Sequence, residues 1–191
     1  MAPLPVTVVP PPPVPPPPPP EVHEHPGLFI HGDFGVSYLR TSGSRAGSPF
    51  VGNGAAMGAA IAIGWAPDDE WAFALEGWAW KALSPSGLGS RTSVELQAIG
   101  LNVTRYIVPI DVFATVVLSG TRLAITDGGD YVEYDSSDIG FGLKVLLGKE
   151  WRVSPQFGIG VAAELFLALN RNGDETLDTL GGGVVFSFTF R

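Results

Sequence analysis

The sequence predicts an all-β protein, an eight-stranded antiparallel up-and-down transmembrane β-barrel that follows a disordered proline-rich segment. Three observations predict this fold. Large apolar residues alternate with small or polar ones, short connections alternate with long ones, and the few charges within the predicted strands share one face. A period of two indicates strands, because successive side chains of a strand point to opposite faces.

Composition divides the chain into two parts. Twelve of the 18 prolines fall within residues 1–20, and the nearly unbroken run from Pro10 to Pro20 favours polyproline II and cannot build a packed core. We therefore predict a linker over residues 1–26, as a spacer rather than a ligand for a proline-recognising domain, and a barrel over residues 27–191. No secretory signal follows Met1, so we expect a mature or trimmed form.

Charge and hydropathy restrict the solvent and the partners. Charged residues make up 16% of the chain and the mean hydropathy is +0.24, whereas an ordinary soluble domain carries about 25% charged residues. The net charge of −8 argues against nucleic-acid binding. The chain has no cysteine, which excludes disulfides and thiolate metal sites, and we predict no cofactor and no metal.

Eight segments carry the alternation of a strand. In residues 157–167, for example, large aliphatic and aromatic side chains alternate with glycine, alanine and Glu164. The segment 92–107 changes phase near Ala98 and Ile99, which predicts a β-bulge, and the segment 111–123 is apolar on both faces. The predicted strands are 28–40, 53–66, 71–83, 92–107, 111–123, 137–149, 155–168 and 178–190.

The connections between these segments differ in length in a regular way. Short turns are predicted at 67–70, 108–110 and 150–154, and longer loops at 41–52, 84–91, 124–136 and 169–177. Short turns on one rim and long loops on the other are typical of outer-membrane barrels. The most apolar stretch, 51–66, is shorter than the roughly 20 residues of a membrane-spanning helix and contains several glycines, so we interpret it as a strand.

Polar and charged residues within the strands indicate which face meets lipid. They lie opposite the large aliphatic residues, so we place them in the lumen, where a narrow barrel is filled by side chains that must pair. We favour a hydrogen-bonded structural network over a proton relay or an ion path. A soluble lipocalin-like barrel would have the faces reversed. The predicted polar network of the lumen comprises His31, Asp33, Glu76, Glu95, Gln97, Lys144 and Glu164.

Aromatic residues gather at two places. Trp65, Trp71, Tyr106 and Trp151 fall at the predicted short-turn ends of strands, where an interfacial girdle is expected. The chain ends on Phe186, Phe188, Phe190 and Arg191. This ending resembles the last strand of outer-membrane barrels, which closes on alternating aromatics and a terminal Phe that serves as an assembly signal; Arg191 departs from that pattern.

Two further stretches extend the resemblance. Residues 25–38 after the proline-rich leader, and residues 139–151, look like the first strand and the sixth strand with its turn in outer-membrane barrel proteins of the myxobacterial type. The resemblance implies a bacterial outer-membrane location with both termini in the periplasm. It also implies contact with outer-membrane lipids and lipopolysaccharide, and with the barrel-assembly machinery during biogenesis. We expect a monomer.

The sequence argues against catalysis and leaves the activity open. The barrel enzymes that this fold resembles use a histidine near the outer rim, whereas His23 and His25 lie in the leader and His31 lies near the short-turn end. Acidic residues in the loops 124–136 and 169–177 fit no calcium-loop motif. Our leading hypothesis is a non-enzymatic outer-membrane protein with a structural or surface-interaction role. The alternatives are a small solute or ion pore and a soluble lipocalin-like binder of an apolar ligand.

Overall fold

The computed structural model describes residues 27–45, 48–88, 91–128, 132–173 and 175–191. The predicted linker over residues 1–26 lies outside the described residues. Nine strands occur in the described part of the chain. They are β1 (Gly27–Arg45), β2 (Ser48–Ala66), β3 (Trp71–Leu83), β4 (Thr92–Ile107), β5 (Val112–Gly128), β6 (Val132–Ser136), β7 (Gly140–Arg152), β8 (Phe157–Asn172) and β9 (Glu175–Phe190).

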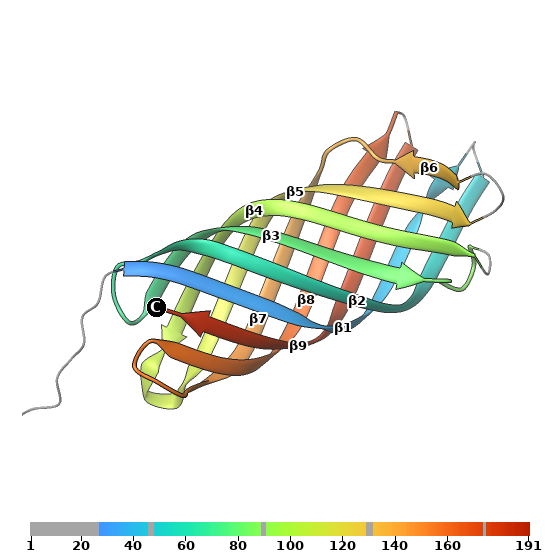
Figure 1. The fold of residues 1–191 in the computed structure, drawn as a ribbon. Coiled ribbons are helices and arrows are strands. Elements are labelled where there is room, and N and C mark those ends of the chain that lie inside the picture. Colours follow the sequence, from blue (N-terminus) through green and yellow to red (C-terminus); the bar gives the residue numbers. More distant parts are fainter. Residues whose placement is uncertain (1–26, 46–47, 89–90, 129–131, 174) are drawn as a thin grey trace, which may run out of the picture.

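Eight of these strands close into a barrel (Figure 1). Each barrel strand pairs antiparallel with its neighbours in the chain, β5 pairs with β7, and the first and last strands β1 and β9 pair with each other. The short β6 pairs with the end of β5, so it extends a loop and is not a barrel strand. The predicted eight-stranded antiparallel barrel is therefore confirmed.

The strand registers run without interruption. Every pairing of β4 with β3 and with β5 keeps a constant offset from one end to the other. The bulge predicted near Ala98 and Ile99 is therefore wrong, and Val94, Leu96, Gly100 and Asn102 all face the lumen. The apparent change of phase comes from the lumen itself, which is lined by apolar residues near the loop end of β4 and by polar residues farther down.

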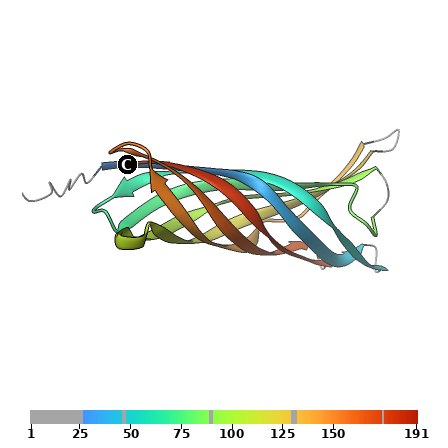
Figure 2. The same cartoon turned by 90° about the horizontal axis from the view of Figure 1, so that it is seen from below.

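Short turns join the strands at one end, where the C-terminus also lies (Figures 1 and 2). In the β2–β3 turn, the Asp68 carboxylate accepts hydrogen bonds from the backbone N–H groups of Glu70 and Trp71, at 2.8 and 2.7 Å. The β4–β5 turn is the 3₁₀-helix Val108–Ile110, and it ends at Asp111 with a φ of 56°. An aspartate is one of the few residues other than glycine that adopts this left-handed backbone readily.

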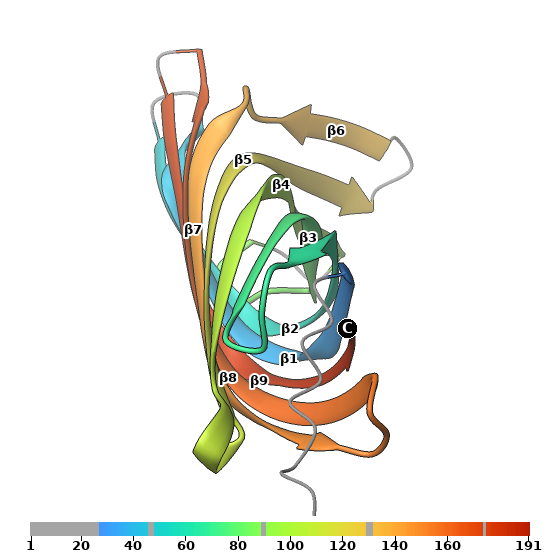
Figure 3. The same cartoon turned by 90° about the vertical axis from the view of Figure 1, so that its left-hand side faces the viewer.

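Several strands are longer at the loop end than the sequence predicts. The β1–β2 hairpin continues to Arg45 and Ser48, and β5 continues to Gly128, where it pairs with β6 beyond the ring of strands (Figure 3). The sequence 137–149 was predicted as a strand, but β7 is displaced by three residues to Gly140–Arg152. Alternation does not reveal such extensions, because above the apolar band both faces of a hairpin meet water.

Side chains alternate between an apolar outside and a filled lumen. Phe34, Val36 and Tyr38 face outwards from β1, whereas Asp33 and Ser37 are buried. The lumen is packed so closely that some backbone positions have no room for a side chain. For example, a Cβ atom on Gly181 would lie 2.1 Å from the ring of Phe166. The described residues contain no helix that is long and apolar enough to cross a membrane.

Candidate functional site

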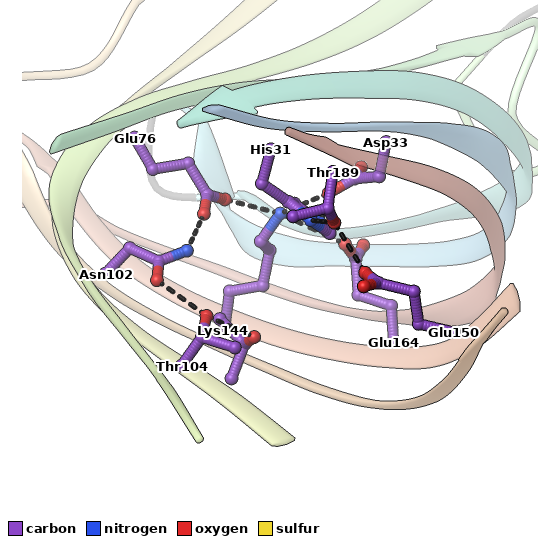
Figure 4. A network of polar contacts seen from close by, with 10 residues as sticks. His31, Asp33, Glu76, Asn102, Thr104, Lys144, Glu150, Glu164 and Thr189 are labelled. Atoms are coloured by element: carbon purple, nitrogen blue, oxygen red, sulfur yellow. Dashed lines mark hydrogen bonds and ion pairs between the residues drawn. The ribbon is translucent and has the colours of Figure 1, made fainter. Parts of the chain in front are cut away.

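A charged cluster occupies the middle of the lumen (Figure 4). Its centre is Lys144 on β7, which is completely buried. The Nζ atom of Lys144 lies 2.6 Å from Glu76 Oε1 on β3, 3.3 Å from Glu164 Oε2 on β8 and 3.5 Å from Asp33 Oδ2 on β1. One ammonium group therefore connects four strands around the barrel. We call Lys144, Asp33, Glu76 and Glu164 the lumen charge cluster.

The strand pattern brings these groups together. Each of the four residues stands at an inward position near the middle of its strand, and all four side chains are buried. A buried ammonium is stable only when it is paired and hydrogen-bonded. Three carboxyl groups around one ammonium supply these partners and make the centre of the lumen acidic.

Further polar side chains hold the carboxylate of Glu76 in place. The Nδ2 atom of Asn102 donates a hydrogen bond to Glu76 Oε2, and Thr104 Oγ1 donates to Asn102 Oδ1 at 2.9 Å. Thr104 Oγ1 also lies 2.7 Å from Thr115 Oγ1 on β5. All of these residues are buried. The network thus reaches from the cluster across β4 to β5.

A second chain of contacts leads from the cluster towards the short-turn end of the barrel. His31 lies 4.0 Å from the Asp33 carboxylate, and its Nδ1 atom is 2.9 Å from Thr189 Oγ1 on β9. Thr189 donates a hydrogen bond to Glu150 Oε2 at 2.6 Å. Glu150 in turn lies 4.0 Å from the guanidinium of Arg191. Polar groups therefore line the lumen from its centre to this mouth.

Arg191 closes the mouth. Its guanidinium lies 3.9 Å from the ring centroid of Tyr106, and it donates a hydrogen bond to the carbonyl oxygen of Asp69 at 3.1 Å. The hollow beside Tyr106, Glu150 and Arg191 has a volume of about 10 Å³. This is space for about one water molecule.

An apolar plug fills the lumen above the cluster. Trp80 stacks on Phe166 with ring centroids 5.6 Å apart, and Trp78 lies tilted against the same ring at 5.7 Å. Lys144 Nζ lies 5.8 Å from the centroid of Trp78, which is an attractive cation–π arrangement. Leu39 and Leu96 are fully buried at this end of the lumen. The cluster is therefore enclosed on the loop side by bulky side chains.

The structure places most of the predicted lumen residues together, with two exceptions. His31, Asp33, Glu76, Lys144 and Glu164 meet as described above. Glu95 and Gln97 do not join them: both face outwards on β4, where Gln97 donates to Glu95 at 2.5 Å and Lys81 pairs with Glu95 at 3.2 Å. The prediction was wrong because it depended on the bulge that β4 lacks.

The predicted girdle also needs one correction. Trp65 and Trp151 are 52% and 47% exposed on the outside of the short-turn end, and Trp71 is partly exposed there. Tyr106 is 4% exposed and points into the lumen, under Arg191. Tyr106 lies at the short-turn end of its strand, as the tryptophans do. It points into the lumen because it is on the same face of β4 as Asn102 and Thr104. Phe186, Phe188 and Phe190 point outwards from β9.

Several residues of the network were missed in the sequence. All except Arg191, which follows the last strand, stand at inward positions of strands. The spacing of two residues between Asn102, Thr104 and Tyr106 is the signal that could have revealed part of them. Glu150 was assigned to a turn, so its inward direction was not considered. The missed residues are Asn102, Thr104, Thr115, Glu150, Thr189 and Arg191.

Comparison with known proteins identifies a fold. No protein-family model matches the chain, and no curated protein matches it in sequence. Neisserial surface protein A is similar in structure, with a TM-score of 0.60 and 17% identity over 85% of this chain and 96% of that protein. Ail of Yersinia pestis gives a TM-score of 0.43 at 10% identity, over 83% and 98% of the two chains. The Escherichia coli outer membrane protease OmpT gives 0.42 at 8% identity, over 88% and 97%. The likeness to the Neisserial protein shows a shared barrel fold.

Proposed function

We propose that this protein is an integral barrel of the bacterial outer membrane with a structural or surface-interaction role and no enzymatic activity. In this proposal the short turns and both chain ends face the periplasm, and the long loops face the outside. The proposal includes its place among barrels of the myxobacterial type, which rests on the sequence resemblance of residues 25–38 and 139–151.

The observation that carries the proposal is the apolar band around the barrel. On β1 the outward side chains from Leu28 to Tyr38 are uncharged, and on β9 the same holds from Leu180 to Phe190. Each stretch comprises eleven residues. At about 3.3 Å per residue and a tilt of about 40°, the ten intervals between them cover roughly 25 Å of the barrel axis, the height of the apolar band of outer-membrane barrels.

The contents of the lumen argue against the soluble alternative. A lipocalin-like binder needs a polar outside and an apolar cavity for its ligand. Here Leu101, Val116 and Leu147 are exposed on the outside, whereas the charged residues Lys144 and Glu164 lie within. Exposing such a continuous apolar surface to water would favour aggregation, so lipid is the solvent that suits this barrel.

The same contents argue against a pore. The plug of Trp78, Trp80 and Phe166 lies directly beside the lumen charge cluster. An eight-stranded barrel is just wide enough for its side chains to fill. We therefore expect no steady conductance when the protein is incorporated into planar bilayers; a stable single-channel current in the wild-type protein would favour the pore instead.

The buried histidine supports a non-enzymatic role. His31 is 4% exposed and contacts Asp33 and Thr189, below the plug and far from the loop end. A substrate of the outer leaflet would have to pass the plug to reach it.

The loop hairpins, which rise beyond the apolar band at β1–β2 and β5–β6, are the part of the molecule that other surfaces can meet.

Membrane insertion is the direct test. The full chain, refolded from urea into phosphatidylcholine vesicles, should remain with the vesicles in alkaline carbonate and require detergent for release. It should also run at different positions on a gel before and after boiling, because a closed barrel resists the detergent until it is heated. Recovery in the carbonate supernatant as a folded soluble protein would overturn the proposal.

A further inference from the structure

A polar patch lies on the outside of the barrel at the loop end of β3, β4 and β5. Lys81 pairs with Glu95 at 3.2 Å, and Gln97 donates to the other carboxylate oxygen of Glu95 at 2.5 Å. Arg122 stands opposite Gln97 in the strand register, and it donates to Ser136 Oγ at 2.8 Å. We call Lys81, Glu95, Gln97 and Arg122 the outer polar patch.

The outer polar patch marks the upper border of the apolar band. Ile99 lies on the same face of β4, two residues from Gln97 towards the short-turn end. Leu118 lies on β5, four residues from Arg122 in the same direction. Both are exposed apolar side chains. On the far side of the barrel, the exposed side chain of Arg171 follows Leu169 in the same way. Exposed basic residues thus lie on both sides of the barrel at the upper border of the apolar band, together with the exposed Asp138 and Asp178.

Two open hollows lie in the apolar face directly beside the patch. One, of about 440 Å³, is bordered by Ala59, Ile61, Gly77, Ala79 and Gln97. The other, of about 330 Å³, is bordered by Gln97, Ile99, Gly120, Arg122 and Ile139. Gln97 separates them, so two apolar depressions meet the same polar patch.

The absence of side chains at two glycines creates these hollows. A Cβ on Gly77 would have the carbonyl oxygen of Ala98 as its nearest neighbour at 4.0 Å, and one on Gly120 would have Ile139 Cγ2 at 3.5 Å. Both distances are ordinary contacts, so larger residues would fit there. In a bilayer such depressions are filled by acyl chains, since water is not available at this depth.

We propose that the outer polar patch and its two hollows bind one molecule of a phosphorylated, multiply acylated glycolipid, the lipid A part of lipopolysaccharide. This rests on the proposed function, which places the patch in the outer leaflet. A phosphate group lies between Lys81 and Arg122, and acyl chains occupy the hollows on either side of Gln97.

The charges of the patch suit a phosphate. Lys81 and Arg122 contribute two positive charges against one negative charge, and the carboxylate of Glu95 is already held by Lys81 and Gln97. Of its five N–H donors, Arg122 uses one on Ser136. Among the described residues the Arg122 side chain has no other hydrogen bond. Its remaining donors can form charge-assisted hydrogen bonds to a phosphate, which guanidinium and ammonium groups both prefer. A second copy of this chain would instead bring another patch of the same net charge.

The test measures retention of lipid by the intact barrel. The full chain, refolded in dodecyl maltoside micelles, is titrated with purified diphosphoryl hexa-acyl lipid A, and bound lipid is counted by native mass spectrometry. The double variant Lys81→Gln with Arg122→Gln should bind about tenfold more weakly, because it loses both charge-assisted contacts. The double variant Gly77→Leu with Gly120→Leu should weaken binding similarly by filling the hollows.

Matched variants control for general effects of charge and bulk. Arg40→Gln with Arg171→Gln removes two basic residues from the far side of the same rim, and Ala163→Leu adds bulk to the apolar face of β8. Both should retain wild-type binding. Heat-modifiable mobility on a gel checks that every variant is a closed barrel before its binding is compared.

Each other outcome overturns the assignment. Equal binding by the Lys81 and Arg122 variant, or by the Gly77 and Gly120 variant, means that this surface is not the site. Equal binding of dephosphorylated lipid A means that only apolar contact is involved. If phosphatidylglycerol binds and the variants weaken its binding in the same way, the surface recognises anionic phospholipid in general. If dimers form in place of bound lipid, the occupant is a second copy of this chain. A barrel that inserts into vesicles but ignores lipid A refutes this inference alone, whereas a chain that does not insert refutes the proposed function.

Discussion

At the scale of single residues, Lys144 is the side chain on which most of the lumen depends. Its ammonium group lies within 3.5 Å of carboxylate oxygens from three strands, and it also lies over the ring of Trp78. Removing one partner from a buried ionic network leaves the other charges without compensation, which costs far more than removing a surface charge. The three carboxyl groups around Lys144 make this effect larger than in a simple pair.

Replacing Lys144 with Met should lower the free energy of unfolding by about 3–5 kcal/mol, because Asp33, Glu76 and Glu164 lose their shared counter-charge. Unfolding by guanidinium in detergent micelles measures the change. Lys149→Met on the same strand is the control: this side chain is exposed, so a change within about 1 kcal/mol is expected. A Lys144 variant as stable as the control, or one that opens a conducting channel, contradicts a structural role for the cluster.

The partners of Lys144 should show coupling when they are changed together. Glu76 is the nearest carboxylate at 2.6 Å, so Glu76→Gln should cost stability in the wild-type protein. In the Lys144→Met background the same change should cost less or restore stability, because it removes an uncompensated charge. Equal costs in both backgrounds, measured by the same unfolding experiment, would mean that the two residues do not interact energetically.

At the scale of elements, the last strand connects packing in the lumen with closure of the barrel. Gly181 on β9 lets the ring of Phe166 approach the backbone, and this ring stacks against Trp80 in the plug. On the same strand, Thr179 lies 3.1 Å from Thr41 and Thr189 lies 2.9 Å from His31. These two contacts bridge β9 and β1 inside the lumen, where the first and last strands of the chain meet.

Gly181→Ala should destabilise the barrel by about 1–3 kcal/mol, because the new methyl group overlaps the ring of Phe166 in a filled lumen. Gly77→Ala on β3 is the matched control, since its methyl group meets nothing closer than 4.0 Å and its backbone becomes less flexible in the unfolded chain. The stability of the two variants is compared through the denaturant concentration at the unfolding midpoint, provided that the free energy of unfolding depends on denaturant with the same slope in both. Equal midpoints for Gly181→Ala and Gly77→Ala would show that the plug can rearrange around an added methyl group without loss of stability.

Arg191, which follows the last outward aromatic residue, contacts groups inside the mouth of the barrel. Phe190 faces outwards like Phe186 and Phe188, whereas Arg191 folds into the mouth and contacts Tyr106 and Glu150. Arg191→Ala should therefore insert normally but lose about 1 kcal/mol of stability. The exposed Arg152 on the same rim, changed to Ala, is the control. A failure of Arg191→Ala to assemble in cells, with normal refolding in vesicles, would assign Arg191 to the assembly signal instead.

At the scale of the whole molecule, the two ends of the barrel differ. One end has tight turns, outward tryptophans and the Arg191 contact, and the other has hairpins that extend beyond the apolar band (Figures 1 and 3). The barrel is also asymmetric around its axis. Towards the loop end, the outward face of β4 becomes charged at Glu95, two residues beyond Gln97, whereas the outward face of β8 is apolar up to Leu169. We therefore expect such a barrel to adopt one defined orientation in a membrane.

Orientation can be measured because the chain has no cysteine of its own. Arg91→Cys places a thiol next to β4 at the loop end, and Gln156→Cys places one in the β7–β8 turn; both positions are exposed. A maleimide that does not cross membranes should label the first variant on intact cells and the second only after the outer membrane is permeabilised. The reverse pattern would invert the proposed topology.

The sequence was sufficient for the architecture because the period of two persists along the chain. Alternation on β1, β7 and β8 assigned His31, Asp33, Lys144 and Glu164 to one face without any knowledge of their contacts. Where both faces of a strand meet similar surroundings, the pattern loses its meaning. This is why the predicted strands 28–40, 53–66 and 111–123 stop short of the loop ends of β1, β2 and β5. Glu95 and Gln97 were assigned to the lumen for a different reason, the bulge that β4 lacks.

The sequence by itself thus determined the barrel, its number of strands and the inward direction of Asp33, Lys144 and Glu164, because these follow from local alternation and the length of connections. Only the tertiary structure decided which inward groups meet. Glu76 contacts Lys144 because β3 and β7 face each other across the lumen, and Arg191 contacts Tyr106 because the residue after β9 reaches across the mouth of the barrel to β4. Neither pair is close in sequence, and the distances between them depend on how the closed sheet curves. Glu95 faces outwards to Lys81 for a related reason. The register of β4 is uninterrupted, so its side chains alternate strictly between the two faces of the sheet.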